Sequence, residues 1–287
     1  MRLGVLGGRA VVVDGDRAAD VASASRGRLP ADPMALLEDW QPVRDWAAGL
    51  PDDAFDLPVD PTALGAPVPR PRQVFAVALN YQPHAAEGGY PPPEEPLVFT
   101  KFPACITGPH TTVVLPEGKV DWEVELVAVI GRRTYRVSED RAWAAVAGLT
   151  VGQDISERIT QARGKPAQFS LGKSFPGFGP TGPVLVTPDE LDDPDDLEIT
   201  GLLGGEVVQH DRTKSMIFPV PDLIARLSAV LPLLPGDLIF TGTPAGVGNR
   251  MNPPRYLTVG DELVSRIQGI GEIRQHFTTA TAEDGPS

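Results

Sequence analysis

The fold is decided by one stretch, VDWEVELVAVI at residues 120–130. In its first half, apolar Val120, Trp122 and Val124 alternate with polar residues, which is typical of a half-buried strand with Glu123 and Glu125 on one face. Its second half, residues 126–130, is apolar without alternation, which is typical of a strand covered on both faces. The stretch therefore predicts a strand that carries two carboxylates into a covered core.

Two carboxylates on one strand face need compensation. At positions i and i+2 they lie only about 7 Å apart and repel each other. Exposed Glu pairs are common, so a solvated strand face is one interpretation. A covered strand favours another, in which an oxygen-seeking divalent cation compensates the buried charge. Asp154 follows a predicted strand at 148–151 and is a candidate third ligand; a helix N-cap is the alternative for this residue.

Composition limits the classes of function. The chain has 287 residues, 38 acidic side chains against 25 Lys and Arg, and a net charge of −13. We expect no binding to nucleic acid or to an anionic membrane surface. A single cysteine, Cys105, excludes an intramolecular disulfide, and no apolar run approaches about 18 residues. A cytoplasmic protein is expected.

The positions of Pro and Gly residues indicate boundaries that divide the chain into three parts. We expect a small N-terminal domain at 1–71, with a hairpin over 3–13 and helices within 31–50 that begin at Asp32-Pro33. Residues 72–278 are expected to form a second, larger domain, and residues 279–287 a disordered tail. Strands are predicted at 73–79, 97–106, 111–115, 197–203 and 238–240, and helices at 141–147 and 221–229.

Three further segments carry candidate chemistry. His84 and Glu87 have the i, i+3 spacing that lets a carboxylate orient an imidazole, although a surface turn is the alternative. They lie in the segment 81–96, whose glycines and prolines are typical of a lid. Lys173 lies in a glycine-rich loop, either against a developing oxyanion or as a surface lysine. The segment TGTPAGVG at 241–248 has open amides but lacks the ending of a nucleotide-binding loop.

Five ordered motifs together resemble the fumarylacetoacetate hydrolase family over residues 72–277. They are Asn-Tyr-x-x-His-Ala-x-Glu, Asp-Trp-Glu-Val-Glu-Leu, Gln-Asp-Ile-Ser-x-Arg, Leu-Gly-Lys-Ser-Phe and Thr-Gly-Thr-Pro-Ala-Gly-Val-Gly. The resemblance implies a β-rich α+β fold with a mixed β-roll core and a small N-terminal α+β domain. It also implies a homodimer and a bound Mg²⁺ or Mn²⁺.

The resemblance also implies residue roles. The metal ligands would be Glu123, Glu125 and Asp154, and the water-activating pair would be His84 and Glu87. The other implied contacts are Lys173 at the oxyanion, Tyr81, Arg158 and Gln161 at the substrate, and Thr243 at a substrate carboxylate. Ile159 and Pro176 depart from the family pattern, which has Asp at these positions in many bacterial members. We expect the departures to remove two charges near the pocket.

The predicted function is metal-dependent hydrolysis of a carbon–carbon bond in a diketo acid such as an acylpyruvate or a fumarylpyruvate-like compound. Decarboxylation of a 2-oxo acid, or isomerisation or hydration of an unsaturated oxo-dicarboxylate, would use the same cation. A binding protein that has lost catalysis is a third hypothesis. The predicted partner in every case is a small oxo-acid.

Overall fold

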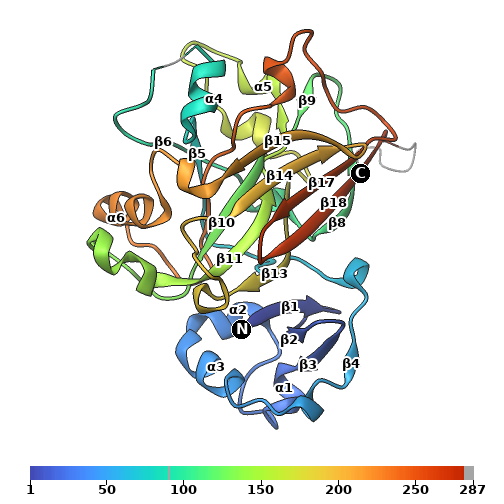
Figure 1. The fold of residues 1–287 in the computed structure, drawn as a ribbon, viewed down its shortest axis with the longest axis vertical. Helices are drawn as coiled ribbons and strands as arrows, with labels where there is room; N and C mark the ends of the chain where they lie inside the picture. Colours follow the sequence, from blue (N-terminus) through green and yellow to red (C-terminus); the bar gives the residue numbers. More distant parts are fainter. Residues whose placement is uncertain (90, 281–287) are drawn as a thin grey trace.

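The structure is a computed structural model that describes residues 1–89 and 91–280. Most of the predicted disordered tail, residues 281–287, lies outside the described residues. The chain forms a strand-rich α+β fold in which the N-terminal segment lies at one end of two large sheets (Figure 1). This confirms the predicted fold class.

The main sheet has 11 strands and runs through both parts of the molecule. Its order is β4-β3-β2-β1-β13-β11-β10-β16-β5-β6, and β7 also pairs with β13. The bounds are β1 Arg2–Leu6, β2 Arg9–Asp14, β3 Arg17–Asp20, β4 Leu57–Pro58, β5 Val74–Ala78, β6 Leu97–Thr100, β7 Ile106–Thr107, β10 Val124–Ile130, β11 Val146–Gln153, β13 Gly179–Val186 and β16 Leu238–Phe240.

A five-stranded sheet covers the main sheet, in the order β15-β14-β17-β18-β8. Three parallel pairings, β16 with β5, β18 with β8 and β13 with β7, make the architecture mixed. A small ladder joins β9 to β12. The bounds are β8 His110–Val114, β9 Val120–Asp121, β12 Ser156–Glu157, β14 Glu198–Leu203, β15 Glu206–Arg212, β17 Glu262–Ile267 and β18 Gly271–Thr278.

Helices are short, and several begin at the signals expected from the sequence. Asp32 caps the second helix by accepting a hydrogen bond from the Met34 amide at 3.2 Å, with Pro33 in the first turn. The α-helices are α1 Val21–Ala24, α2 Pro33–Glu38, α3 Trp40–Ala47, α4 Gln82–Glu87, α5 Arg158–Gln161 and α6 Val220–Val230. The 3₁₀ helices include Pro103–Cys105, Glu139–Ala145, Ser170–Lys173 and Gly248–Arg250.

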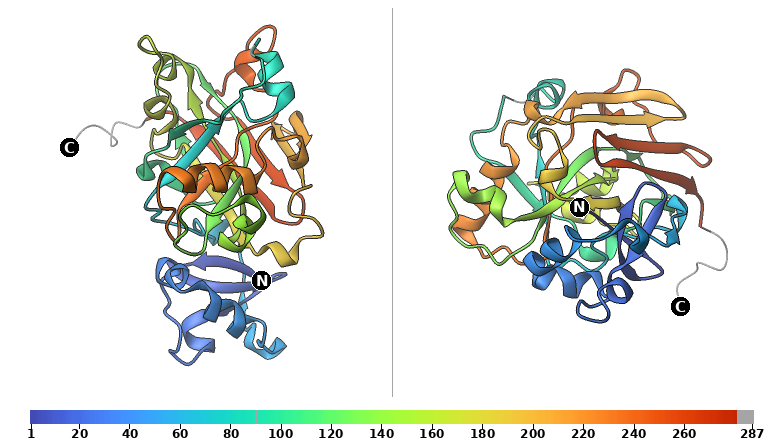
Figure 2. Two further views of the ribbon diagram at one scale, coloured as in Figure 1. Left: turned by 90° about the vertical axis from the view of Figure 1, so that its left-hand side faces the viewer. Right: turned by 60° about the horizontal axis from the view of Figure 1, so that its bottom comes forward.

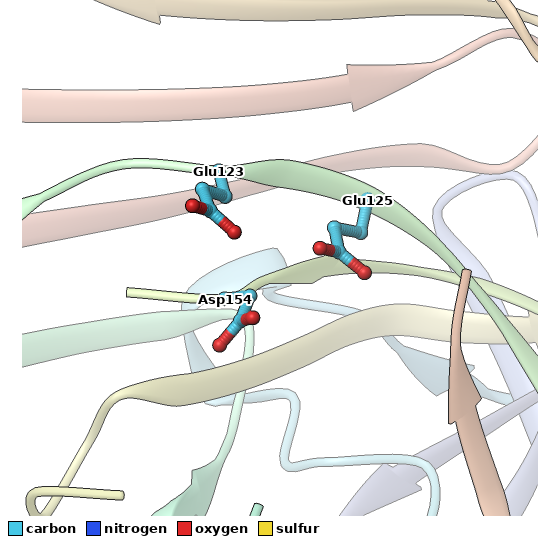
Figure 3. A group of neighbouring side chains, drawn as sticks. All are labelled: Glu123, Glu125 and Asp154. Atoms are coloured by element: carbon cyan, nitrogen blue, oxygen red, sulfur yellow. The ribbon is translucent and has the colours of Figure 1, made fainter. Parts of the chain in front are cut away.

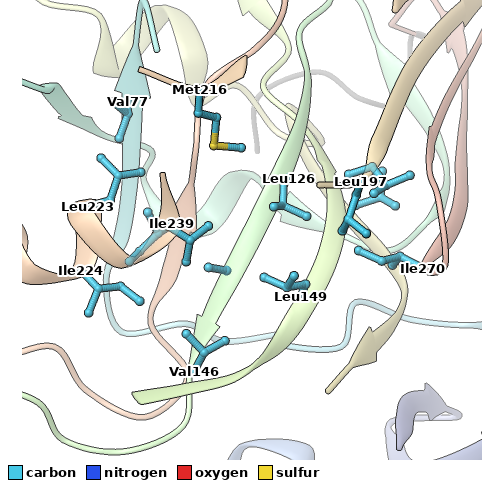
Figure 4. Close-up of a cluster of buried hydrophobic side chains, with 14 of the residues drawn as sticks. Val77, Leu126, Val146, Leu149, Leu197, Met216, Leu223, Ile224, Ile239 and Ile270 are labelled. Atoms are coloured by element: carbon cyan, nitrogen blue, oxygen red, sulfur yellow. The ribbon is translucent and has the colours of Figure 1, made fainter. Parts of the chain in front are cut away.

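Strand β10 lies at the centre of the core. Leu126 and Ala128 pack into one buried cluster, part of which is drawn in Figure 4, whereas Val127 and Val129 pack into another. The strand is therefore covered on both faces, as its apolar run predicts. The prediction of a half-buried first half is wrong, because every residue from 120 to 130 is buried. Glu123 and Glu125 consequently face the interior of the protein.

The N-terminal unit continues the main sheet. It is visible as a separate body at one end of the molecule (Figure 2). However, β1 pairs with β13 through Leu3 and Leu185, and the Trp40 indole donates to the Ala147 carbonyl at 3.1 Å. Leu3, Trp40 and Val127 share one hydrophobic cluster. The boundary at residue 71 stays a prediction, and the core runs across it.

Three predicted elements differ in the structure. The strand over 120–130 is interrupted at Trp122 and Glu123, because their amides donate to the side chains of Asp121 and Gln153. The strand over 97–106 breaks between β6 and β7, where a 3₁₀ helix begins at Pro103. The helix over 141–147 is a 3₁₀ helix that ends at Ala145, because the following residues join β11.

Candidate active site

Three buried carboxylates converge at the ends of two neighbouring strands. Glu123 directly precedes β10, Glu125 lies near its start, and Asp154 follows β11 directly. One oxygen from each lies within 4.8 Å of the others, and Figure 3 shows the three side chains grouped together. The Asp154 amide donates to the Glu123 carbonyl at 2.9 Å, which fixes the two segments side by side. The structure thus brings the three predicted carboxylates together, and their role as metal ligands stays a prediction.

Glu125 is the least compensated member of this triad. Its recorded hydrogen bond comes from the Gly242 amide at 2.8 Å, and no cation of the described chain lies within 4.0 Å of its carboxylate. Burial, together with the charges of Asp154 and Glu123, raises the pKa of Glu125 well above its usual value. A further positive charge beside Glu125 would lower this pKa and favour the ionised carboxylate.

Glu123 has the opposite electrostatic environment. Burial raises the pKa of its carboxyl, but Lys173 and Arg158 outweigh that effect and hold the pKa at about 2. The Lys173 ammonium lies 2.6 Å from Glu123 Oε2 and 2.6 Å from Asp154 Oδ2, and Arg158 Nη1 lies 2.7 Å from Glu123 Oε1. Lys173 is thus a buried partner of the triad and not a surface lysine.

A second buried lysine, which sequence reasoning missed, lies behind Asp154. Lys101 has 0% exposure, and its ammonium donates to Asp154 Oδ1 at 2.7 Å and to the Lys173 carbonyl. The sequence contained a signal for this role, because Lys101 lies within the apolar run 97–106. A lysine that is buried in such a run usually has a charged partner. Lys101 holds Asp154 from the side opposite to Lys173.

Asp121 is another missed residue, although it lies in the motif that contains Glu123. Its carboxylate is fully buried and accepts hydrogen bonds from Arg158 Nε and Nη2 at 2.9 and 2.7 Å. It also accepts from the amides of Gly248 and Asn249 at 2.8 and 2.9 Å. Asp121 therefore links α5 to the loop at 246–250.

A cavity of about 420 Å³ opens above Glu123 and Lys173. Its polar lining includes residues from α4, α5 and the loop at 246–250, and much of its remaining wall is apolar. The lining residues are Val77, Ala78, Leu79, His84, Gly88, Leu97, Glu123, Arg158, Gln161, Ala162, Ala167, Phe169, Lys173, Thr243, Val247, Asn249 and Arg250. Such a cavity is large enough for a small organic acid.

His84 and Glu87 form the predicted pair on α4. His84 Nδ1 lies 2.7 Å from Glu87 Oε1, and Glu87 Oε2 accepts a hydrogen bond from the Gly246 amide at 3.1 Å. Because a carboxylate only accepts, Nδ1 carries a proton and Nε2 of the neutral ring keeps its lone pair. His84 lines the cavity together with Glu123. The pair is thus placed beside the carboxylate triad.

Comparison with known proteins supplies the family. A sequence model described as "Fumarylacetoacetate (FAA) hydrolase C-terminal" matches residues 73–278. The chain belongs to the fumarylacetoacetate hydrolase family. It is 45% identical over 225 residues to the mitochondrial oxaloacetate tautomerase of Homo sapiens. The aligned region covers 77% of this chain and 72% of the human protein.

Solved structures of the family have the same fold. A crystal structure of a Mycobacterium smegmatis protein provisionally assigned as HpcE is 54% identical, covers 98% of this chain and 100% of that one, and has a TM-score of 0.93. Maleylpyruvate hydrolase from Sphingobium sp. SYK-6, in complex with manganese(II) and pyruvate, is 28% identical at a TM-score of 0.80, with 98% and 100% of the chains covered. The relatives are enzymes and include hydrolases, isomerases and a tautomerase.

The acidic triad fits the divalent metal of these family members. Mg²⁺ and Mn²⁺ prefer carboxylate oxygens, and all three donors here are carboxylates. Glu125 has no cation within 4.0 Å among the described residues, and a bound dication would supply the missing positive charge. The predicted cofactor, Mg²⁺ or Mn²⁺, thus agrees with the donor set and with the manganese-bound family structure.

The resemblance places Gln161, Thr243 and Tyr81 at the substrate, and the structure gives each of them a different environment. Gln161 lines the cavity, and its Oε1 accepts from Arg158 Nη1 at 2.9 Å, so its amide donors are left for a ligand. Thr243 also lines the cavity, but its hydroxyl donates to the Val124 carbonyl at 2.9 Å. A contact from Thr243 Oγ1 as donor to a substrate carboxylate would require another hydroxyl orientation, so this role stays a prediction.

Tyr81 is fully buried and lies outside the cavity lining. Its hydroxyl has no hydrogen-bond partner within the described residues, and burial raises its pKa well above the usual value. A direct substrate contact by Tyr81 therefore finds no support in its position and stays a prediction.

The two departures from the family pattern lie away from the cavity, contrary to expectation. Ile159 is 48% exposed and Pro176 is exposed, and neither belongs to the cavity lining. Ile159 points outward because it follows Arg158 on α5, and Arg158 turns inward to Asp121. The two departures therefore remove no charge from the cavity lining itself.

Proposed function

We propose that the chain is a divalent-metal-dependent hydrolase that cleaves a carbon–carbon bond in a diketo acid of the acylpyruvate or fumarylpyruvate type. The observation that carries the proposal is the His84–Glu87 pair, which lies in the same cavity wall as Glu123. A base oriented next to a metal site is what attack by water on a carbonyl requires.

The charge of the site suits an anionic oxo-acid. Four buried carboxylates, those of Asp121, Glu123, Glu125 and Asp154, face three cations, those of Lys101, Arg158 and Lys173. With all four carboxylates ionised, the cluster carries an excess of one negative charge. A dication held by Glu123, Glu125 and Asp154 would reverse that sign and supply Lewis-acid polarisation of the oxo and carboxylate oxygens.

His84 provides the proton transfers. Nε2 takes a proton from water as the water oxygen bonds to the distal carbonyl carbon, and Glu87 stabilises the imidazolium through Nδ1. When the carbon–carbon bond breaks, its electron pair passes to the 2-oxo acid fragment. That fragment takes up a proton at carbon, for which His84 is the donor, and the products are two carboxylic acids.

Lys173 and Gln161 face the developing oxyanion in this scheme. Two of the three ammonium protons of Lys173 go to Glu123 and Asp154, which leaves one for a ligand in the cavity. Gln161 offers its amide group from α5. Such preorganised donors are typically worth about 10²- to 10³-fold in rate.

The test is hydrolysis of acetylpyruvate by His84→Ala and Glu87→Gln with saturating Mn²⁺. Each change should lower kcat by about 10²-fold or more, with Mn²⁺ affinity retained. Glu95→Gln is the matched control, because Glu95 lies exposed in the same segment and pairs with Arg226. Its rate should equal that of the wild type. Undiminished hydrolysis by His84→Ala would show that the pair does not activate water.

The identity to the human oxaloacetate tautomerase favours a second candidate, keto–enol conversion of oxaloacetate. This reaction moves a proton between carbon and oxygen and needs no attack by water. Decarboxylation or isomerisation of a related oxo-acid would also need no such attack. Product analysis distinguishes them: two acids indicate hydrolysis, CO₂ indicates decarboxylation, and an isomer indicates the tautomerase class. Ligand binding without turnover would indicate a binding protein.

The proposal includes a cytoplasmic homodimer. The described residues contain no helix that is long and apolar enough to span a membrane. Light scattering of the purified protein would measure its mass in solution, and a monomer would contradict the dimer.

A further inference from the structure

The charged groups that line the cavity differ in whether they already have partners. Arg158 pairs with Asp121 and Glu123 at 2.7 Å each, and Lys173 pairs with Glu123 and Asp154 at 2.6 Å. His84 pairs with Glu87 at 2.7 Å. All three side chains are therefore paired with the protein's own carboxylates.

Arg250 is the exception among the lining cations. Across residues 1–89 and 91–280, no carboxylate lies within ion-pair distance of its guanidinium, and no hydrogen bond from its side chain is recorded. Arg255, a few residues along the same loop, shows the contrast, because it pairs with Glu206 at 2.7 Å. The cavity thus contains a planar group with five N–H donors and no internal acceptor.

The neighbouring residue adds donors of the same kind. Asn249 Oδ1 accepts a hydrogen bond from the Tyr256 hydroxyl at 2.8 Å, which directs the amide NH₂ away from that contact. The backbone amide of Asn249 is held by Asp121 at 2.9 Å. Gly248 allows this close packing, because a Cβ there would lie 2.1 Å from the Arg255 carbonyl oxygen. The loop that carries Asn249 and Arg250 is therefore fixed against the buried Asp121.

The contacts separate this donor group from the metal triad. Glu123 touches Arg158, Arg158 touches Asp121, and Asp121 touches the Asn249 amide. Two side chains thus stand between the triad and the loop. Apolar Val77, Leu97 and Phe169 are among the residues that line the same cavity. A ligand with an oxo-acid head at the triad could lay a carbon chain along such residues and reach Arg250 with its far end.

We propose that Arg250, assisted by Asn249, is a specificity-determining residue that selects 2-oxo acids with a second carboxylate at the end distant from the oxo group. This inference rests on the proposed 2-oxo acid site. A guanidinium binds a carboxylate through two parallel hydrogen bonds, which a point charge does not reproduce. Arg250 is exposed, so water screens the contact and the selectivity should be about tenfold, in line with a partly screened charge-assisted hydrogen bond.

The experiment compares two unreactive ligands that differ at one end. Binding of 2-oxoglutarate and of 2-oxohexanoate is measured by titration calorimetry on the full chain with saturating Mn²⁺. The variants are Arg250→Gln, Arg250→Lys and the control Arg255→Gln. Wild type and Arg255→Gln should bind 2-oxoglutarate about tenfold more tightly than 2-oxohexanoate. Arg250→Gln should bind both alike, and Arg250→Lys should fall between.

The outcomes separate this inference from the proposed hydrolase. An unchanged preference in Arg250→Gln, or an equal weakening of both ligands, overturns the role of Arg250. Failure of the wild type to bind either ligand overturns the 2-oxo acid site and the inference with it. A tenfold preference that depends on Arg250 in a protein without hydrolase activity supports the inference and rejects only the hydrolysis.

Discussion

At the residue scale, Glu123 and Glu125 carry the same side chain in opposite electrostatic environments. Glu123 touches Lys173 and Arg158, whereas Glu125 has no cation within ion-pair distance in the described part of the chain. Both belong to the triad whose oxygens lie within 4.8 Å of one another. Their contributions to stability should therefore differ in sign when the metal is removed, although both are needed to bind it.

We predict that Glu125→Gln raises the midpoint of thermal unfolding in excess EDTA, whereas Glu123→Gln lowers it by several degrees. The first change removes a buried repulsion, and the second leaves Lys173 and Arg158 without a shared partner. Both variants should lose the stabilisation that Mn²⁺ confers on the wild type. Differential scanning calorimetry with and without Mn²⁺ measures these effects. Equal destabilisation of the two variants in EDTA would contradict the assignment.

At the element scale, Asp121 joins β9, α5 and the loop at 246–250. One carboxylate oxygen accepts from the amides of Gly248 and Trp122, and the other accepts from Arg158 and the Asn249 amide. An asparagine would keep one oxygen but would turn its NH₂ group toward donors. The change should therefore release Arg158 and the loop while it leaves the backbone ladder of β9 in place.

We predict that Asp121→Asn weakens Mn²⁺-dependent binding of pyruvate by about tenfold or more, because hydrogen bonds to a charged group are worth about 1.5–3 kcal/mol. Asp121 acts through Arg158, so the same change in an Arg158→Gln background should cost less than about twofold. Titration calorimetry of the four proteins completes the cycle. If the two changes weaken pyruvate binding additively, Asp121 has a merely structural role. If Arg158→Gln binds pyruvate as tightly as the wild type, Arg158 does not belong to the substrate site.

The same elements show what could be predicted from the sequence. Glu123, Glu125 and the covered strand β10 could be predicted, because their signals are local alternation and an apolar run. The His84–Glu87 contact also has a local spacing. Lys101 and Asp121 acquire their roles from Asp154 and from Arg158, which lie 53 and 37 positions away in the chain. A lysine in an apolar run indicates a buried charge, but no local pattern shows which distant residue it pairs with.

At the scale of the whole molecule, Asp237 links three strands of the main sheet. Its carboxylate accepts hydrogen bonds from the Gln73 amide at 3.1 Å, from Gln73 Nε2 at 2.6 Å and from the Leu234 amide at 2.7 Å. Its carbonyl accepts from the Ile130 amide at 3.0 Å. The residue thus lies where β5, β10 and β16 meet. Burial outweighs these hydrogen bonds and raises the pKa of Asp237 from 3.8 to about 6.

The raised pKa of Asp237 predicts a loss of stability with rising pH. The folded protein binds this proton more tightly than the unfolded chain does, so the contribution is complete below pH 3.8 and disappears as the pH rises through about 6. The shift corresponds to a change of about 3 kcal/mol in the free energy of unfolding.

Asp237→Asn does not titrate, so its free energy of unfolding minus that of the wild type should increase between pH 4 and pH 7. Subtraction cancels the titration of the other carboxyl groups, including those of the metal site, and leaves the absolute effect of the amide as a constant offset. Urea unfolding of both proteins at several pH values, in EDTA, measures the difference. A difference that stays constant or decreases over this range would show that the Asp237 proton is bound no more tightly in the folded state than in the unfolded chain.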